Sequence, residues 1–262
     1  MELPLTGRVA LVTGVSRHRG IGFAVARRLA AMGADLFVTH HRAHDEEQPW
    51  GADDVTAVIA QLREQSPGAV ADTPADLAEP TAPAQVVAQA VDAFGHLDIA
   101  VCNQARSGGD GTLLDLDAAM LDAHWQVDAR AALLLTQQFA RQHDGRAGGR
   151  VIWMTSGQQR GPMPGVVAYA AAKAALAGVL VTVADELVQR NILLNAVNPG
   201  PVNTGYLDPE HTGDRGPQLL AMFPQGRFGE PDDPARLIGW LVSDEGRWVV
   251  GQVIDSEGGF RR

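Results

Sequence analysis

The stretch RVALVTGVSRHRGIG, residues 8–22, decides the fold. Its first part, residues 8–13, has the composition of a buried strand, and a helix is expected over residues 22–32. Between them lie Gly14 and Gly20, which let the backbone turn tightly and approach a pyrophosphate at the positive end of that helix. Five residues separate these glycines, so their spacing is not the common dinucleotide fingerprint. Their place between strand and helix is what indicates a dinucleotide site.

Outward from this stretch, short β-branched runs alternate with longer alanine-rich amphipathic segments. Strands are expected at residues 8–13, 35–39, 69–71, 97–102, 150–155, 192–197 and 252–255, and helices at 22–32, 52–64, 84–94, about 116–142, 166–190 and 234–242. This order predicts an α/β fold, a single-domain Rossmann-type doubly wound parallel sheet of about seven strands with helices on both faces. The domain spans residues 1–262, and the long Gly/Pro-rich segment 203–229 is expected to be a substrate lid.

Charge and cysteine content exclude several classes of protein. The 262 residues carry a formal net charge of −10, whereas nucleic-acid binders concentrate positive charge. The one cysteine, Cys102, allows neither an internal disulfide nor a zinc cluster. Residues 1–4 show no basic region before an apolar run, and the apolar stretch 168–183 is interrupted by Lys173. We therefore expect a cytoplasmic protein without a membrane span.

Three residues form the most specific pattern in the chain. Ser156 follows the expected strand 150–155, Tyr169 lies thirteen residues later, and Lys173 lies four residues after that. Positions four apart share one face of a helix, so the tyrosine and the lysine can point into one site. The chain has 21 basic residues but only one lysine, and only two tyrosines, so this spacing would arise by chance in under about 1% of shuffled sequences. A lysine kept at position 173 therefore indicates a role that needs a compact ammonium and that the planar guanidinium of an arginine could not fill.

With these residues in place, the chain resembles the short-chain dehydrogenase/reductase family, of the type that includes the 3-oxoacyl-carrier-protein reductases. The resemblance covers residues 7–260. The motifs that carry it are Thr13-Gly14 to Gly22, Asp76-Leu77, Leu97 to Ala105, Ser156/Tyr169/Lys173, Asn198-Pro199-Gly200 with Val202 and Thr204, Gly226-Arg227-Phe228-Gly229, Gly251-Gln252 and Glu257-Gly258-Gly259.

The resemblance implies a role for each of these residues. Tyr169 would be the general acid/base, Ser156 would hold the substrate oxygen, and Lys173 would help the tyrosine to ionise while it grips the nicotinamide ribose. Asp76 would contact adenine, and Asn103 would lie beside the adenine ribose. The full set expected to bind the cofactor is Gly14, Ser16, Arg17, Gly20, Ile21, Gly22, His41, Arg42, Asp76, Leu77, Asn103, Tyr169, Lys173, Pro199, Gly200, Val202 and Thr204.

Besides the longer glycine loop, two departures from the family pattern affect the site. Cys102-Asn103-Gln104-Ala105 stands where the family has Asn-Asn-Ala-Gly, so the backbone beside the cofactor is expected to differ. The family's fourth catalytic residue, an asparagine that positions a water between the lysine and solvent, falls at Asp128. An ionised aspartate accepts hydrogen bonds but does not donate them. We expect Asp128 to lie a short water chain from Lys173 and the enzyme to remain active.

Charge around the expected second strand favours NADP(H), with NAD(H) as the alternative. NAD-binding sites place an acidic residue at the end of this strand, whereas a 2′-phosphate attracts cations. Here residues 39–42 read Thr-His-His-Arg, and the glycine loop carries Arg17 and Arg19. The histidines at 40, 41 and 44 are not expected to bind a metal, because adjacent residues of an extended chain point to opposite sides.

These features predict an NADP(H)-dependent carbonyl reductase or alcohol dehydrogenase. Its substrate would be a small ketone or alcohol lying among residues 106–114, 157–166 and 203–223, which mix apolar residues with few charges. Small residues on the helix from residue 166 favour a homo-oligomer, a dimer of dimers as the family resemblance implies. The alternatives are a cofactor-binding regulator without turnover, to which Asp128 alone points, and a structural protein, which would have no use for Ser156, Tyr169 and Lys173.

Overall fold

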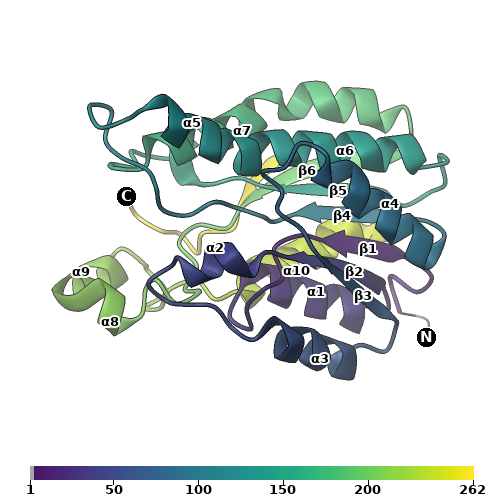
Figure 1. Cartoon of the computed structure of the whole chain (residues 1–262), viewed down its shortest axis with the longest axis horizontal. Coiled ribbons are helices and arrows are strands. Elements are labelled where there is room, and N and C mark those ends of the chain that lie inside the picture. Colours follow the sequence, from purple (N-terminus) through teal and green to yellow (C-terminus); the bar gives the residue numbers. More distant parts are fainter. Residues whose placement is uncertain (1–2) are drawn as a thin grey trace.

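The computed structural model describes residues 3–262, and its core is one parallel sheet (Figure 1). Seven strands lie in the order β3-β2-β1-β4-β5-β6-β7, and every neighbouring pair is parallel. The strands are β1 (Val9–Val12), β2 (Asp35–His40), β3 (Val70–Pro74), β4 (Ile99–Cys102), β5 (Gly149–Met154), β6 (Ile192–Asn198) and β7 (Val253–Asp255). The fold class predicted from the sequence is confirmed.

The strand order reverses beside β1. The chain first builds outward through β2 and β3, and then returns to place β4 on the other side of β1, with Leu11 between Phe37 and Ala100. In a doubly wound sheet the loops after these two strands diverge, and the crevice between them is where ligands bind. The expected dinucleotide loop, residues 13–22, opens at this crevice.

Helices cover both faces of the sheet (Figure 1). On one face lie α4 (Ala82–Phe94), α5 (Ala118–His124), α6 (Ala131–Gln142) and α7 (Val167–Val188), and on the other lie α1 (Ile21–Ala31), α3 (Val55–Gln65) and α10 (Asp232–Val242). The two faces form separate apolar clusters, one centred on Trp153 and Phe139 and the other on Ile99 and Leu29. Burial of these clusters is the main favourable contribution to folding.

The expected helix 116–142 is not a regular α-helix throughout. A π-helical turn over Trp125–Arg130 joins α5 to α6, and it contains Asp128. Single π turns are rare and occur mostly at functional sites, because they re-aim the side chains beside them. Helix α2 (Arg42–Glu46) was not predicted, since five mostly charged residues carry no apolar periodicity.

The segment 203–229 contains helices α8 (Pro209–Thr212) and α9 (Gly216–Ala221), which project from the body of the molecule (Figure 1). It is tied to the glycine loop by an ion pair of 2.6 Å between Arg19 and Asp208. Asn203 Nδ2 donates to the same carboxylate at 2.8 Å. The segment lies beside the crevice, with Thr204 at the cleft, and its role as a lid stays a prediction.

Among the helices of residues 3–262, α7 alone is long and apolar enough, by length and composition, to cross a membrane. The core helix of a soluble protein passes the same test, so this is weak evidence for a span. In this fold α7 packs against β6, and Leu176 and Leu180 on its inner face belong to the core. The same face buries Lys173.

Candidate active site

The glycine loop is held against the end of β4. Gly14 has φ +71°, a left-handed conformation that favours glycine. A side chain on Gly22 would overlap the Gly14 carbonyl oxygen, so the first turn of α1 packs directly on the loop. Asn103 Nδ2 donates to the carbonyl oxygens of Thr13 and Gly14 at 3.0 and 3.3 Å. The loop is therefore fixed in shape by the residue that follows β4.

Gln104, at the position where the family has alanine, also fixes the loop. Its side chain is buried and accepts a hydrogen bond from the Thr13 hydroxyl, and its Nε2 donates to the carbonyl oxygen of Val127 at 3.3 Å. It thus connects the end of β1 to the π turn that carries Asp128.

A cleft of about 410 Å³ opens beside the glycine loop. It is lined by ten of the expected cofactor residues, namely Gly14, Ser16, Arg17, Gly20, Ile21, His41, Asp76, Leu77, Asn103 and Thr204. Two further lining residues, Trp50 and Arg106, have buried nitrogen donors (Nε1 and Nε) without a hydrogen-bond partner among residues 3–262. Unpaired buried donors beside a glycine-rich loop fit a ligand rich in phosphate and hydroxyl oxygens.

The cations expected around the cofactor are placed differently from one another. Arg17 lines the cleft, stacks on Trp50 with 5.7 Å to the ring centre, and donates to the Thr204 carbonyl oxygen. Burial lowers the pKa of Arg17, against the opposing effect of Asp45. Arg42 lies outside the cleft and pairs with Glu46 at 2.9 Å on the surface. Among residues 3–262, no group of three His, Cys, Asp or Glu side chains is arranged to hold a metal ion.

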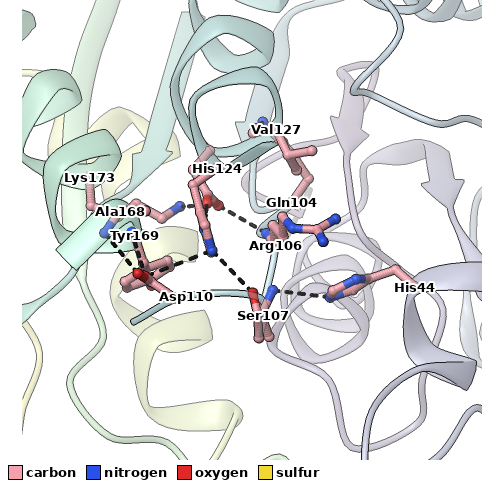
Figure 2. A network of polar contacts seen from close by, with 12 residues as sticks. His44, Gln104, Arg106, Ser107, Asp110, His124, Val127, Ala168, Tyr169 and Lys173 are labelled. Carbon is pink, nitrogen blue, oxygen red and sulfur yellow. Dashed lines mark hydrogen bonds and ion pairs between the residues drawn. The ribbon is translucent and has the colours of Figure 1, made fainter. Parts of the chain in front are cut away.

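The start of α7 is capped from a distant loop (Figure 2). The Asp110 carboxylate accepts hydrogen bonds from the backbone N–H groups of Ala168, Tyr169 and Gly111 at 2.9, 2.8 and 2.7 Å. Burial raises the pKa of Asp110, but these three hydrogen bonds outweigh it and the net shift is downward. A helix N-terminus has unpaired N–H groups, so this cap fixes the first turn, and with it Tyr169.

Lys173 is buried one turn after Tyr169, with 2% of its side chain exposed. Its Nζ donates to the Met154 carbonyl oxygen at 3.0 Å and lies 5.7 Å from the centre of the Tyr169 ring. Asp128 Oδ1 is 3.6 Å from Nζ, a direct ion pair rather than the water-linked contact expected from the sequence. Ser156 lies two residues beyond Met154, with its Oγ 3.9 Å from Met163 Sδ.

His124 completes this group, and the sequence analysis missed it. Its Nδ1 is 3.0 Å from Asp128 Oδ2, and its Nε2 is 3.1 Å from the Gly108 carbonyl oxygen. The ring lies edge-on to Tyr169, with 6.0 Å between the centroids (Figure 2). The spacing of His124 and Asp128, four residues apart on a predicted helix, is a signal that could have found it.

The loop that carries Gly108 is held from the opposite side by His44. Ser107 N donates to His44 Nε2 at 3.2 Å, so this ring nitrogen accepts (Figure 2). Burial lowers the pKa of His44, which agrees with a neutral ring. The loop therefore spans from the cleft to the buried group around Lys173.

The segment after β6 lies on the remaining side. Asn198 Oδ1 accepts from Gly200 N at 3.1 Å, which shapes the turn through Pro199, and Val202 pairs with Gly229 across the base of the lid segment. Within that segment, burial first and the neighbouring Tyr169 second raise the pKa of Tyr206. The two tyrosines of the chain thus lie near each other.

Known proteins match the chain along almost its full length. A family model described as Enoyl-(Acyl carrier protein) reductase matches residues 14–261. An uncharacterized oxidoreductase, YjdA, of Bacillus subtilis is 38% identical over 97% of both chains. Cyclohexanol dehydrogenase of Rhodococcus sp. is 35% identical over 99% of this chain and 98% of its own. The crystal structure of a short-chain dehydrogenase from Burkholderia cenocepacia in complex with NADP has a TM-score of 0.83 and 34% identity, with 98% of each chain covered.

Proposed function

The chain belongs to the short-chain dehydrogenase/reductase family of oxidoreductases, and on this premise we propose that it interconverts a ketone and a secondary alcohol with NADP(H). One observation carries the proposal: the only lysine of the chain is buried one helical turn from Tyr169, at the carboxyl end of β5 that leads to Ser156. Burial of a charge is expensive unless it is paired, and the ammonium is held here by Asp128 and the Met154 carbonyl oxygen.

In the proposed reaction each residue has one task. The Tyr169 hydroxyl gives a proton to the carbonyl oxygen on reduction and takes it back on oxidation. Ser156 donates a hydrogen bond to the same oxygen and so orients it. Lys173, held by Met154 and Asp128, stabilises the phenolate through its positive charge.

The cofactor fits the cleft beside the glycine loop. NADP(H), when bound, supplies or accepts the hydride. Arg17 and His41 line the cleft and would face the 2′-phosphate, while Asp76 and Asn103 would lie at the adenosine. The complex of the Burkholderia cenocepacia relative with NADP supports this choice. The surface pair of Arg42 and Glu46 leaves Arg42 a lesser part than the sequence suggested.

The substrate would bind between Ser156 and the lid, residues 203–229. Tyr206 of the lid lies near Tyr169 and, as a neutral phenol, offers an apolar ring with one hydrogen-bonding group. Trp50 contacts the lid from the cofactor side, with its ring 6.0 Å from Tyr206. The lid thus adjoins both halves of the crevice, which suits a moderately apolar ketone. The cyclohexanol dehydrogenase relative supports an alcohol as the reduced partner.

Association into a homo-oligomer is part of the proposal. Val179 and Val181 on α7, Leu121 on α5 and Trp125 at the start of the π turn are exposed apolar side chains. Contact between copies through these helices would remove them from water. Light scattering at micromolar concentration tests this, and a monomer would contradict it.

The activity is tested by mixing the protein with NADPH and a panel of ketones and following loss of NADPH absorbance. We expect turnover by the wild type and at least about a 100-fold loss of kcat in Tyr169→Phe, with NADPH affinity retained. Tyr206→Phe is the matched comparison, since it removes the other tyrosine hydroxyl of the chain, and because that hydroxyl is proposed to bind substrate it should raise KM and keep most of kcat. NADPH binding without oxidation by any ketone would favour a regulator instead.

A further inference from the structure

Four titratable side chains are buried together beside Tyr169, namely Asp110, His124, Asp128 and Lys173. Figure 2 labels all of them except Asp128. We propose that His124 is a positively charged imidazolium that cancels the charge of Asp128 and holds that carboxylate on Lys173. His124 is then a positioning residue for the reaction. This inference rests on the proposed function for its kinetic consequences, but the charge of His124 can be tested without any turnover.

The hydrogen-bond geometry of the ring requires two protons. His124 Nδ1 faces Asp128 Oδ2 at 3.0 Å, and Nε2 faces the Gly108 carbonyl oxygen at 3.1 Å. A carbonyl oxygen only accepts, so Nε2 carries a hydrogen. A carboxylate also only accepts, so Nδ1 carries one as well whenever Asp128 is ionised. A neutral ring would leave one nitrogen lone pair directed at an oxygen only 3.0 or 3.1 Å away, which is too close for a water between them.

A hydrogen-bond donor and a cation face the other oxygen of the Asp128 carboxylate. Its Oδ1 accepts a hydrogen bond from Arg106 N at 3.0 Å and lies 3.6 Å from Lys173 Nζ. Both contacts favour the carboxylate over the acid. On the other side of His124, Asp110 Oδ2 lies 3.8 Å from Nε2, and the hydrogen bonds that cap α7 favour its ionised form too. The cluster then holds two cations and two anions, a balanced set in a site with almost no exposure to water.

This balance explains how an aspartate works where the family resemblance places an asparagine. An unpaired carboxylate at this position would oppose formation of a phenolate at Tyr169 and would bind Lys173 too strongly. The pair of His124 and Asp128 has no net charge, like the amide it replaces. The titratable side chain of Tyr169 also faces the imidazole ring, from α7, with 6.0 Å between the ring centres.

Three variants separate charge balance from simple packing: His124→Asn, Asp128→Asn and the double variant. An asparagine amide can still donate to Asp128 but carries no charge, so His124→Asn should lower kcat by about 100-fold while NADPH affinity measured by titration changes little. The double variant restores neutrality and should recover kcat to within about tenfold of the wild type. If the double variant loses as much kcat as His124→Asn or more, while its melting temperature stays near that of the wild type, the proposal is wrong.

A matched control lies far from the site. His96 also pairs with a buried aspartate, 3.1 Å from Asp98 just before β4, at the opposite end of the strands. His96→Asn should leave kcat within about twofold, since this pair does not contact the cluster. A loss equal to that of His124→Asn would mean that any such substitution weakens the fold, and it would overturn the assigned role.

The charge itself is read from the imidazole nitrogen resonances of histidine-labelled wild-type protein, with His124→Asn used to assign the signal. We expect both nitrogens of His124 to be protonated at pH 7.5, where exposed histidines are mostly neutral. A neutral His124 ring at this pH would overturn the proposal even if every kinetic result agreed. If the wild type shows no turnover, the proposed function fails, but this measurement still decides the charge of His124.

Discussion

The crevice has two halves, one around Lys173 and one around the cofactor cleft. Charged residues are paired in both, but they are buried in the first half and exposed in the second. Around Lys173, the side chains of His124 and Asp128 are at most 1% exposed, and each has partners on more than one side. Around the cofactor cleft, Arg42 and Glu46 are each 55% exposed and pair mainly with each other. Removing one partner of a buried pair leaves a charge that water cannot reach, whereas an exposed partner is simply hydrated. The half around Lys173, the proposed catalytic half, is therefore expected to be rigid and intolerant of change, and the cofactor half tolerant.

The largest effect that follows from this contrast is at Asp110. Asp110→Ala removes the acceptor of three N–H groups at the start of α7 and should lower the free energy of unfolding by about 2–4 kcal/mol. It should also lower kcat by at least about 100-fold, because Tyr169 moves with that turn. Asp117→Ala removes the exposed local cap of α5 and should cost about 1 kcal/mol with kcat kept. Denaturant melts and kcat of both variants test the difference, and equal losses would refute it.

An intermediate effect is expected at Arg17, the partly buried cation of the cofactor half. Arg17→Ala should weaken NADPH binding by about 1–3 kcal/mol, or about 5- to 150-fold, and NADH binding much less, because only NADPH carries the 2′-phosphate. Arg42→Ala should have a smaller effect, since that side chain lies on the surface with Glu46. Fluorescence titrations with both cofactors decide this. A greater loss in Arg42→Ala would reverse the assignment.

A smaller effect is expected at the exposed link between lid and glycine loop. Hydrogen bonds from Arg19 and Asn203 hold the pKa of Asp208 well below its usual range. A lowered pKa means that the contact stabilises the protein above the pKa of an unfolded aspartate, about 4, and is lost only as pH falls through the lower folded value. Asp208→Asn should cost less than about 1 kcal/mol at neutral pH.

Tryptic cleavage within the lid, after Arg215 or Arg227, measures this link directly. We expect cleavage of Asp208→Asn at pH 7 to be up to about fivefold faster than cleavage of the wild type, the factor that corresponds to about 1 kcal/mol. Cleavage at an unchanged rate would show that the ion pair does not restrain the lid.

The smallest effect concerns Cys102, at the end of β4. Burial raises the pKa of its thiol to about 12, although Thr136 and Lys173 act in the opposite direction. The thiol therefore stays protonated and out of reach at pH 8, and we expect alkylating reagents to leave the native protein unmodified. Denatured protein, with a normal thiol, is the control. Rapid labelling of the native protein would show that the catalytic half opens more readily than the cluster implies.

Local pattern predicted most of the fold, because strands and helices bury residues at fixed periods. The seven strands and the long helices were placed within a few residues, while α2, α8 and α9 were missed, since helices of four to six residues carry no periodicity. The sequence predicted one continuous helix over residues 116–142 and gave no sign of the π turn. Nothing in a sequence marks where a helix widens to accommodate a buried carboxylate.

The arrangement of the candidate site was predictable where its residues share a helix and unpredictable where they do not. Tyr169 and Lys173 follow from spacing alone, and His124 with Asp128 would have followed from the same rule. Asp110, in contrast, reaches α7 across 58 positions of sequence, and only the folded chain brings them together. The sequence also could not predict that Arg17 lines the cleft while Arg42 lies outside it, because the turn into α2 decides which arginine lies in the cleft.

The burial of the only lysine gives the protein a spectroscopic property of its own. Growth on lysine labelled with 15N only at the side-chain nitrogen places one isotopic label in each chain, and this nitrogen lies between Met154, Asp128 and the Tyr169 ring. The resulting side-chain resonance needs no assignment by mutation, and its exchange with solvent reports how often the site opens. The centre of this molecule can thus be observed alone, without the overlap that most enzymes would impose.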